Sequence, residues 1–139
     1  MNFPKDILSF KASGQLTFEP LVDFISLQRI ISSVNVNIVP LVKNDFTDCK
    51  SELKFFEAAI VKTITCASPS YTYTSCIKDG ETGFLCQPGM WYKKIRDIYL
   101  KKVDVNGINQ KAYEYVNKFY YGSYIIRNIE EAYDFFVAK

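Results

Sequence analysis

The chain has 139 residues, of which 48% are hydrophobic and 23% charged, and its formal net charge is +2. This length and composition are typical of one soluble unit with a single core, so residues 1–139 are predicted to form one domain. A small, dispersed net charge argues against a nucleic-acid partner. No apolar run in the sequence is close to the length of about 18 residues that a membrane helix requires. The opening MNFPKDILSF lacks the apolar segment of a signal peptide.

The available side-chain chemistry is limited, because the chain has no histidine and only four separate cysteines, Cys49, Cys66, Cys76 and Cys86. Nucleophiles that need a histidine partner are therefore excluded. The cysteine spacing does not suit zinc, so no metal site is expected. Three of the cysteines lie in or beside apolar segments and are interpreted as small buried hydrophobes, with free thiols in a reducing cytoplasm.

The first half of the chain is predicted to alternate short strands with helices, from its apolar periodicity and its proline positions. In chain order these are a strand at residues 5–13, an edge strand at 18–24 broken by Pro20, a helix at 26–34, a strand at 35–41 and a loop at 42–48.

The segment KSELKFFEAAI, residues 50–60, predicts a helix whose cap is Thr47 or Asp48. Residues four apart share a helix face, and one such apolar row contains a carboxylate, Glu57. The row is Leu53, Glu57 and Val61, with Phe56 and Ile60 beside it. Periodicity alone favours a structural role for Glu57, as a cap or as the partner of a lysine such as Lys62.

The second half continues the alternation and then becomes helical. Its predicted elements are a strand at residues 63–68, a short helix, a turn at Asp79-Gly80, a strand at Phe84-Leu85, an amphipathic helix at 90–102 through Trp91, Ile95, Ile98 and Tyr99, a helix from Val105 to Phe119, and a helix with Ile126, Ile129, Tyr133 and Phe136 inward. Such alternation predicts an α/β fold: a Rossmann-like parallel sheet with helices on both faces.

Ligands of parallel sheets bind where the carboxyl ends of the strands meet. Residues 18–24, the loop 42–48, the start of the helix 50–60 and residues 68–71 are expected to converge at this edge. Ser68 and Ser70 lie there but are interpreted as turn residues beside Pro69.

Several motifs occur in a recognisable order: Val39-Pro40, Glu57-Ala58, Ile64 to Ser68, and Ile77-Lys78-Asp79-Gly80 through Gly83-Phe84-Leu85. With the segment from Val22 onward, they resemble the C-terminal, donor-binding half of group 1 family glycosyltransferases of the GT-B fold, which are widespread in bacterial polysaccharide synthesis. The resemblance implies that this chain is one half of a GT-B fold.

The resemblance also implies roles for particular residues. Glu57 would accept hydrogen bonds from the ribose hydroxyls of the donor, and Val22 and Phe24 would border its base. Lys50 and Ser51 would hold the diphosphate at the helix N-terminus, whose partial positive charge suits an anion. Many family members carry a second glutamate at the position of Cys49, so Glu52 is the candidate for that sugar contact here.

The implied reaction is transfer of a sugar from a UDP- or GDP-linked donor to an acceptor hydroxyl, with retention and without a metal or other cofactor. Enzymes of this fold react between two domains, so the partner would be a separate N-terminal acceptor-binding domain. The chain alone is then expected to bind the nucleotide sugar without turnover. The implied location is cytoplasmic, with peripheral association of the full enzyme at the inner membrane face left open. The alternative is a non-catalytic nucleotide-binding or interaction module of Rossmann-like fold.

Overall fold

The computed structural model describes residues 5–137, with the side chains of Lys5, Asp6 and Leu8 excepted. At its centre lies a parallel sheet whose strands are ordered β1 (Val36–Val39), β2 (Ile64–Ala67) and β3 (Phe84–Leu85). Val36 pairs with Ile64 across β1 and β2, and Cys66 pairs with Phe84 across β2 and β3. The predicted α/β architecture with a parallel sheet is confirmed.

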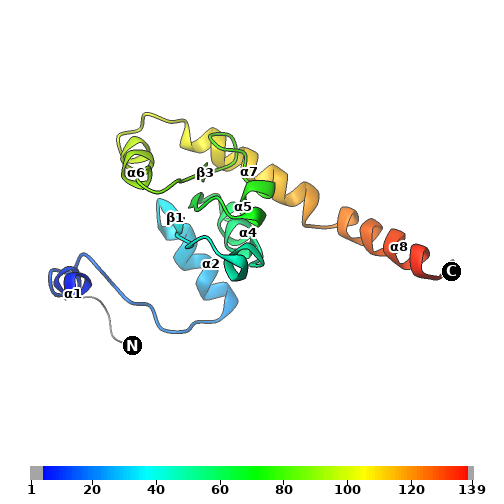
Figure 1. The fold of residues 1–139 in the computed structure, drawn as a ribbon, viewed down its shortest axis with the longest axis horizontal. Helices are drawn as coiled ribbons and strands as arrows, with labels where there is room; N and C mark the ends of the chain where they lie inside the picture. Colours follow the sequence, from blue (N-terminus) through cyan, green and yellow to red (C-terminus); the bar gives the residue numbers. More distant parts are fainter. Residues whose placement is uncertain (1–4, 138–139) are drawn as a thin grey trace.

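Helices account for the rest of the regular structure in the described range. They are α1 (Lys5–Ala12), α2 (Phe24–Ser33), α3 (Asp45–Asp48), α4 (Leu53–Ile60), α5 (Tyr71–Cys76), α6 (Trp91–Tyr99), α7 (Val105–Phe119) and α8 (Ser123–Val137). Helices α1 and α8 lie at opposite ends of the molecule, on either side of the sheet-containing body (Figure 1).

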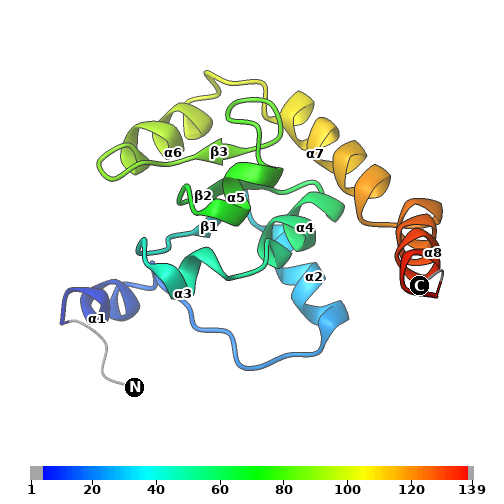
Figure 2. The same cartoon turned by 45° about the vertical axis from the view of Figure 1, so that its right-hand side comes forward.

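The core is divided by the sheet, because successive side chains of a strand point to opposite faces. On one face Val39 and Ala67 pack with the buried side chains of three helices: Phe55 and Ala59 of α4, Tyr73 and Cys76 of α5, and Ala112 and Val116 of α7. On the other face Ile64, Cys66, Phe84 and Cys86 pack with Ile98 of α6 and Ile108 of α7. Helices α2 and α4 run beside each other on the first side, and α6 covers the second (Figure 2).

Most elements lie where the sequence predicts them, namely α2, β1, α4, β2, α5, β3, α6 and α7. The cysteine interpretation is also confirmed: Cys66, Cys76 and Cys86 are buried, Cys49 is exposed, and all four thiols are free. Among the described residues, no helix has both the length and the hydrophobicity required to cross a bilayer.

Three predictions for the first half of the chain are wrong. Residues 5–12 form helix α1 instead of a strand, and residues 18–23 have no regular structure, with residue 24 opening α2. A strand needs a neighbour for its backbone hydrogen bonds, whereas a helix satisfies its own, and Pro20 has no N–H to donate. Within the expected loop 42–48, residues 45–48 form the short helix α3.

Neither expected residue caps α4. Thr47 instead closes a capping box at the start of α3, where its N–H donates to Asn44 Oδ1 at 2.9 Å. Asp48 Oδ1 accepts the Tyr71 N–H at 3.0 Å. Helix α4 starts only at Leu53, after an N-cap, Glu52, that makes no side-chain capping bond.

Two predicted inward faces are also wrong. Helix α4 buries Phe55, Ala58 and Ala59, while Leu53 and Ile60 of the expected stripe are 53% and 45% exposed. The difference arises because α4 packs on β2 and α7 through the Phe55 side. The four residues of α8 expected to point inward are all exposed: Ile126, Ile129, Tyr133 and Phe136. Tyr99, expected on the apolar face of α6, is exposed as well.

Candidate functional site

The carboxyl ends of the three strands meet at a cavity of about 430 Å³. Its walls come from the segments that follow β1, β2 and β3: Pro40, Leu41, Val42, Lys43 and Thr47; Ser68, Pro69 and Ser70; Cys86, Gln87, Pro88 and Trp91. The predicted convergence of the 42–48 and 68–71 segments at this edge is therefore confirmed. Residues 18–24 contribute nothing to this lining.

Hydrogen bonds tie the first two walls together. The Ser68 N–H donates to the Val39 carbonyl at 3.0 Å, which extends the β1–β2 pairing by one residue. The Ser68 hydroxyl accepts the Leu41 N–H at 2.8 Å. The Ser68 side chain is thus occupied in holding the loop after β1, so its turn interpretation agrees with its bonds.

The segment before α4 is fastened to the same edge. The Thr72 hydroxyl of α5 donates to the Lys50 carbonyl at 2.6 Å, and Asp48 accepts the Tyr71 N–H at 3.0 Å. These bonds hold residues 48–50 beside the start of α5, next to the cavity wall at Ser70.

The third wall is positioned by Asp79, in the turn that the sequence predicts at Asp79-Gly80. Its Oδ1 accepts the Leu85 N–H at 2.9 Å, and its Oδ2 lies 3.2 Å from the Lys94 ammonium. Lys94 also lies over the Phe84 ring, 4.4 Å from its centroid. Asp79 therefore joins β3 to α6, and the Cys86–Trp91 wall lies between these two elements.

Gly83 allows β3 to approach β2 in this turn. A Cβ atom at Gly83 would lie 2.9 Å from the Thr65 carbonyl oxygen, which is closer than side chains tolerate. Gly80 has a different reason, since its φ of +79° is a conformation that favours glycine. Both glycines of the DGETG segment are therefore explained by the backbone.

The lining combines flat apolar groups with a few hydroxyls. Trp91 and three prolines provide the apolar surfaces, while Ser70 is only 4% exposed and its hydroxyl has no hydrogen-bond partner. A buried unpaired hydroxyl is costly, so a ligand atom that pairs with it would remove that cost. Burial raises the pKa of the Cys86 thiol, which therefore stays protonated and is a poor nucleophile.

The two glutamates predicted for the site, Glu57 on α4 and Glu52 at its N-cap, lie outside the cavity lining. Glu57 is half-buried, and the ion pairs of the described residues do not include it. Lys62, its alternative structural partner, lies over the Tyr113 ring at 5.0 Å. Glu52 accepts a hydrogen bond from the Tyr120 hydroxyl at 3.3 Å, so its carboxylate faces the end of α7.

The four other predicted residues also lie outside the lining. Lys50 extends over the Phe46 ring, 5.0 Å from its centroid, and Ser51 is exposed beside it. Phe24 is exposed at the first position of α2, and Val22 is half-buried just before that helix. Their roles toward a ligand stay predictions.

Sequence reasoning missed two features of the cavity. The sequence indicates a turn at Ser70 and places Trp91 only on the apolar face of its helix. The segment 86–91 follows a predicted parallel strand, so the rule that placed the other two loops at the carboxyl edge also applies to it. The same rule therefore predicts Trp91 at the carboxyl edge of the sheet. Nothing in the sequence indicates that the Ser70 hydroxyl lacks a hydrogen-bond partner.

A scan of protein-family models, a search of curated proteins and a search of solved structures found no match to this chain. Within residues 5–137, no group of three or more acidic, cysteine or histidine side chains is arranged to hold a metal ion. The expected metal independence is not tested by this finding and stays a prediction.

Proposed function

We propose that this chain binds a nucleotide-diphosphate sugar at the carboxyl edge of its sheet and serves as the donor-binding half of a glycosyltransferase of GT-B fold. Joined to an acceptor-binding domain, it would transfer the sugar to an acceptor hydroxyl in glycan synthesis. The observation that carries the proposal is the cavity at the ends of all three strands, with the unpaired Ser70 hydroxyl in its wall.

The chemistry of the lining supports a ligand with a flat ring and hydrogen-bonding groups. The volume of about 430 Å³ lies in the usual range for small-molecule sites. The indole of Trp91 and the proline rings suit the face of a base or a sugar. The Ser70 hydroxyl and the exposed Lys43 and Gln87 would meet the polar edge of such a ring.

The segment before α4 supports a place for the diphosphate. Glu52 makes no capping bond with its side chain, so the first N–H groups of α4 are not covered by a capping side chain. Lys50 lies on the same segment and is in none of the ion pairs of residues 5–137. A cation beside uncapped N–H groups favours an anionic group at this point.

Calorimetric titration of the chain with UDP and GDP tests the proposal. We expect one of the two to bind saturably, and Ser70→Ala to weaken that binding at least fivefold because the hydroxyl loses its ligand partner. Ser75→Ala is the matched control, since the exposed Ser75 hydroxyl of α5, the helix that Ser70 precedes, only donates to the Tyr71 carbonyl. Absence of saturable binding by either nucleotide would overturn the proposal.

Glu57→Gln, titrated in parallel, tests the ribose role that the resemblance implies. A loss of about tenfold, or about 1.4 kcal/mol, is expected if Glu57 accepts the ribose hydroxyls. In an assay for release of the nucleotide from UDP- and GDP-sugars with a panel of acceptors, the isolated chain is expected to give no turnover. Sustained turnover would contradict the requirement for an acceptor-binding domain.

A further inference from the structure

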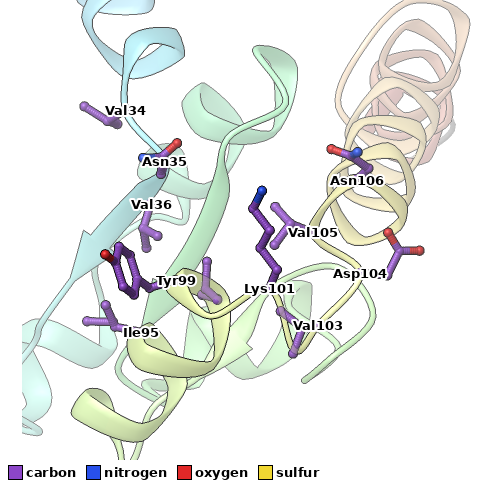
Figure 3. A pocket seen from close by; sticks show the side chains of 11 residues that line it. Val34, Asn35, Val36, Ile95, Tyr99, Lys101, Val103, Asp104, Val105 and Asn106 are labelled. Carbon is purple, nitrogen blue, oxygen red and sulfur yellow. The ribbon is translucent and has the colours of Figure 1, made fainter.

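A second cavity, of about 760 Å³, lies at the opposite, amino-terminal edge of the sheet. Its floor is aliphatic and comes from three parts of the chain: Val34 at the end of α2 with Val36 of β1, Ile95 of α6, and Val103 and Val105 before and in α7. Figure 3 shows these side chains around a common space. The cavity is thus separate from the candidate nucleotide site.

This cavity exists because the sheet ends at β1. Helix α6 packs on β2, and the β1 side chains of that face are left partly uncovered. Ile38 is 47% exposed there, although parallel sheets are normally covered on both faces. An apolar group laid along β1 and α6 would remove this aliphatic surface from water.

One cation stands over the aliphatic floor. Lys101 extends across the cavity from the end of α6, between Val36 of β1 and Asn106 at the start of α7 (Figure 3). The ion pairs of residues 5–137 include its neighbour Lys102, bound to Asp97, but not Lys101. The N-terminal end of the 15-residue helix α7 adds partial positive charge on the far side.

The other charges at the rim limit the ligand to a single negative charge. Asp104 also lines the cavity, but its carboxylate accepts the Gly107 N–H at 3.0 Å as the cap of α7. A dianionic head group would be repelled by this carboxylate and matched by only one lysine. The amides of Asn35 and Asn106 at the rim can donate to carboxylate oxygens.

We propose that the amino-edge cavity binds an aliphatic monocarboxylate, with its chain on the Val–Ile floor and its carboxylate at Lys101. The charge complementarity between this lone ammonium and a monoanion selects the head group. The aliphatic lining formed by Val36, Ile95 and Val105 selects the chain. The site is independent of the proposed nucleotide site, which lies at the other end of the strands.

The test is calorimetric titration of the full chain with octanoate, with 1-octanol as the neutral probe and acetate as the head group alone. Octanoate is expected to bind saturably, at least tenfold tighter than either probe. Lys101→Gly should weaken octanoate at least tenfold. Lys62→Gly is the matched control because Lys62 has the same backbone conformation, with φ 58° against 55°, at the end of α4.

Four outcomes would overturn the proposal. The first is no saturable octanoate binding, the second an equal loss of octanoate affinity in the two glycine variants, and the third an equal affinity for 1-octanol. The fourth is a chain that sediments as a dimer and becomes monomeric in Ile38→Lys, because a second copy would then cover the exposed face of β1. Saturating nucleotide should leave the octanoate affinity unchanged, so either proposal can fail while the other stands.

Discussion

Lys101 and Lys62 occupy backbone positions that usually belong to glycine, and replacing them with glycine should stabilise the protein. Both have left-handed φ values, 55° and 58°. At the end of α6 the Lys101 N–H donates to the Ile98 carbonyl at 3.0 Å and the Lys102 N–H to the Asp97 carbonyl at 2.9 Å. This pair of bonds is the Schellman motif, in which glycine is the preferred residue. Helix α4 ends in the same way at Lys62.

The expected gain follows from two opposing terms. A non-glycine residue in this conformation costs about 1–2 kcal/mol. Glycine in turn loses about 0.5–1 kcal/mol more conformational entropy on folding. Lys101→Gly should therefore raise the free energy of unfolding by up to about 1.5 kcal/mol, with a central value of about 0.75 kcal/mol. Lys62→Gly should gain less, because it also removes an ammonium that lies 5.0 Å from the Tyr113 ring centroid, a contact of about 0.5 kcal/mol.

Urea unfolding followed by circular dichroism and by the fluorescence of Trp91, the one tryptophan, measures both variants. The slope against urea should stay constant while the midpoint rises. Lys101→Ala is the control that separates backbone strain from charge, since alanine keeps the Cβ and should give no such gain. A Lys101→Gly variant that is less stable than the parent, or no more stable than Lys101→Ala, would refute the argument from backbone strain.

Three further predictions concern the core, the thiols and a helix cap. Phe55→Ala should lower the free energy of unfolding by about 4 kcal/mol, because its ring is fully buried, whereas the exposed Phe46→Ala should cost under about 1 kcal/mol; chemical unfolding distinguishes them. Burial raises the pKa of the Cys66 and Cys76 thiols to about 12, above an ordinary value near 9. The unfolded chain therefore releases these protons first, so stability should be complete below pH 9 and fall as the pH rises toward 12; a flat profile in that window would contradict this cause. Asp23 caps α2, and its hydrogen bonds with Ser26 lower its pKa below the ordinary 3.8. Asp23→Ala should lower the melting temperature at pH 7, and the difference from the parent should shrink as acid protonates the native carboxylate.

The parts of the fold that could be predicted are those whose pattern is set by burial on the sheet. Strand β2 is buried at every position, and the compact β-rich sequence of residues 63–68 predicts a strand there. Helix α7 buries Ile108, Ala112 and Val116, whose spacing is that of one helix face. In both cases the tertiary contact reinforces the local preference.

The segments that could not be predicted make few contacts with this core. Residues 5–12 have apolar side chains that fit a strand or a helix. Because no strand lies beside them in the described part of the chain, they form helix α1, which satisfies its own backbone hydrogen bonds. The apolar stripe of α8 has the correct period, but its partner surface is not supplied by the described residues, so the helix forms with Ile126 and Phe136 exposed. Periodicity indicates a helix there without indicating what covers it.

Geometry on α4 explains why the predicted glutamate and the cavity separate. Side chains advance by about 100° per residue around a helix. Phe55, Ala58 and Ala59 define the buried arc, and Glu57, which is half-buried, falls on nearly the opposite side of the helix. Glu57 therefore does not line the cavity, although it shares a helix with residues that pack on the sheet.

The Ser70 and Glu57 variants therefore answer separate questions about the same titration. Weaker nucleotide binding in both would mean that the ligand contacts both residues, with Glu57 accepting the ribose hydroxyls as the resemblance implies. Weaker binding in Ser70→Ala alone would locate the ligand in the cavity and leave Glu57 with a structural role. Weaker binding in Glu57→Gln alone would move the ligand to the Glu57 side of α4, and the unpaired Ser70 hydroxyl would then have no part in nucleotide recognition.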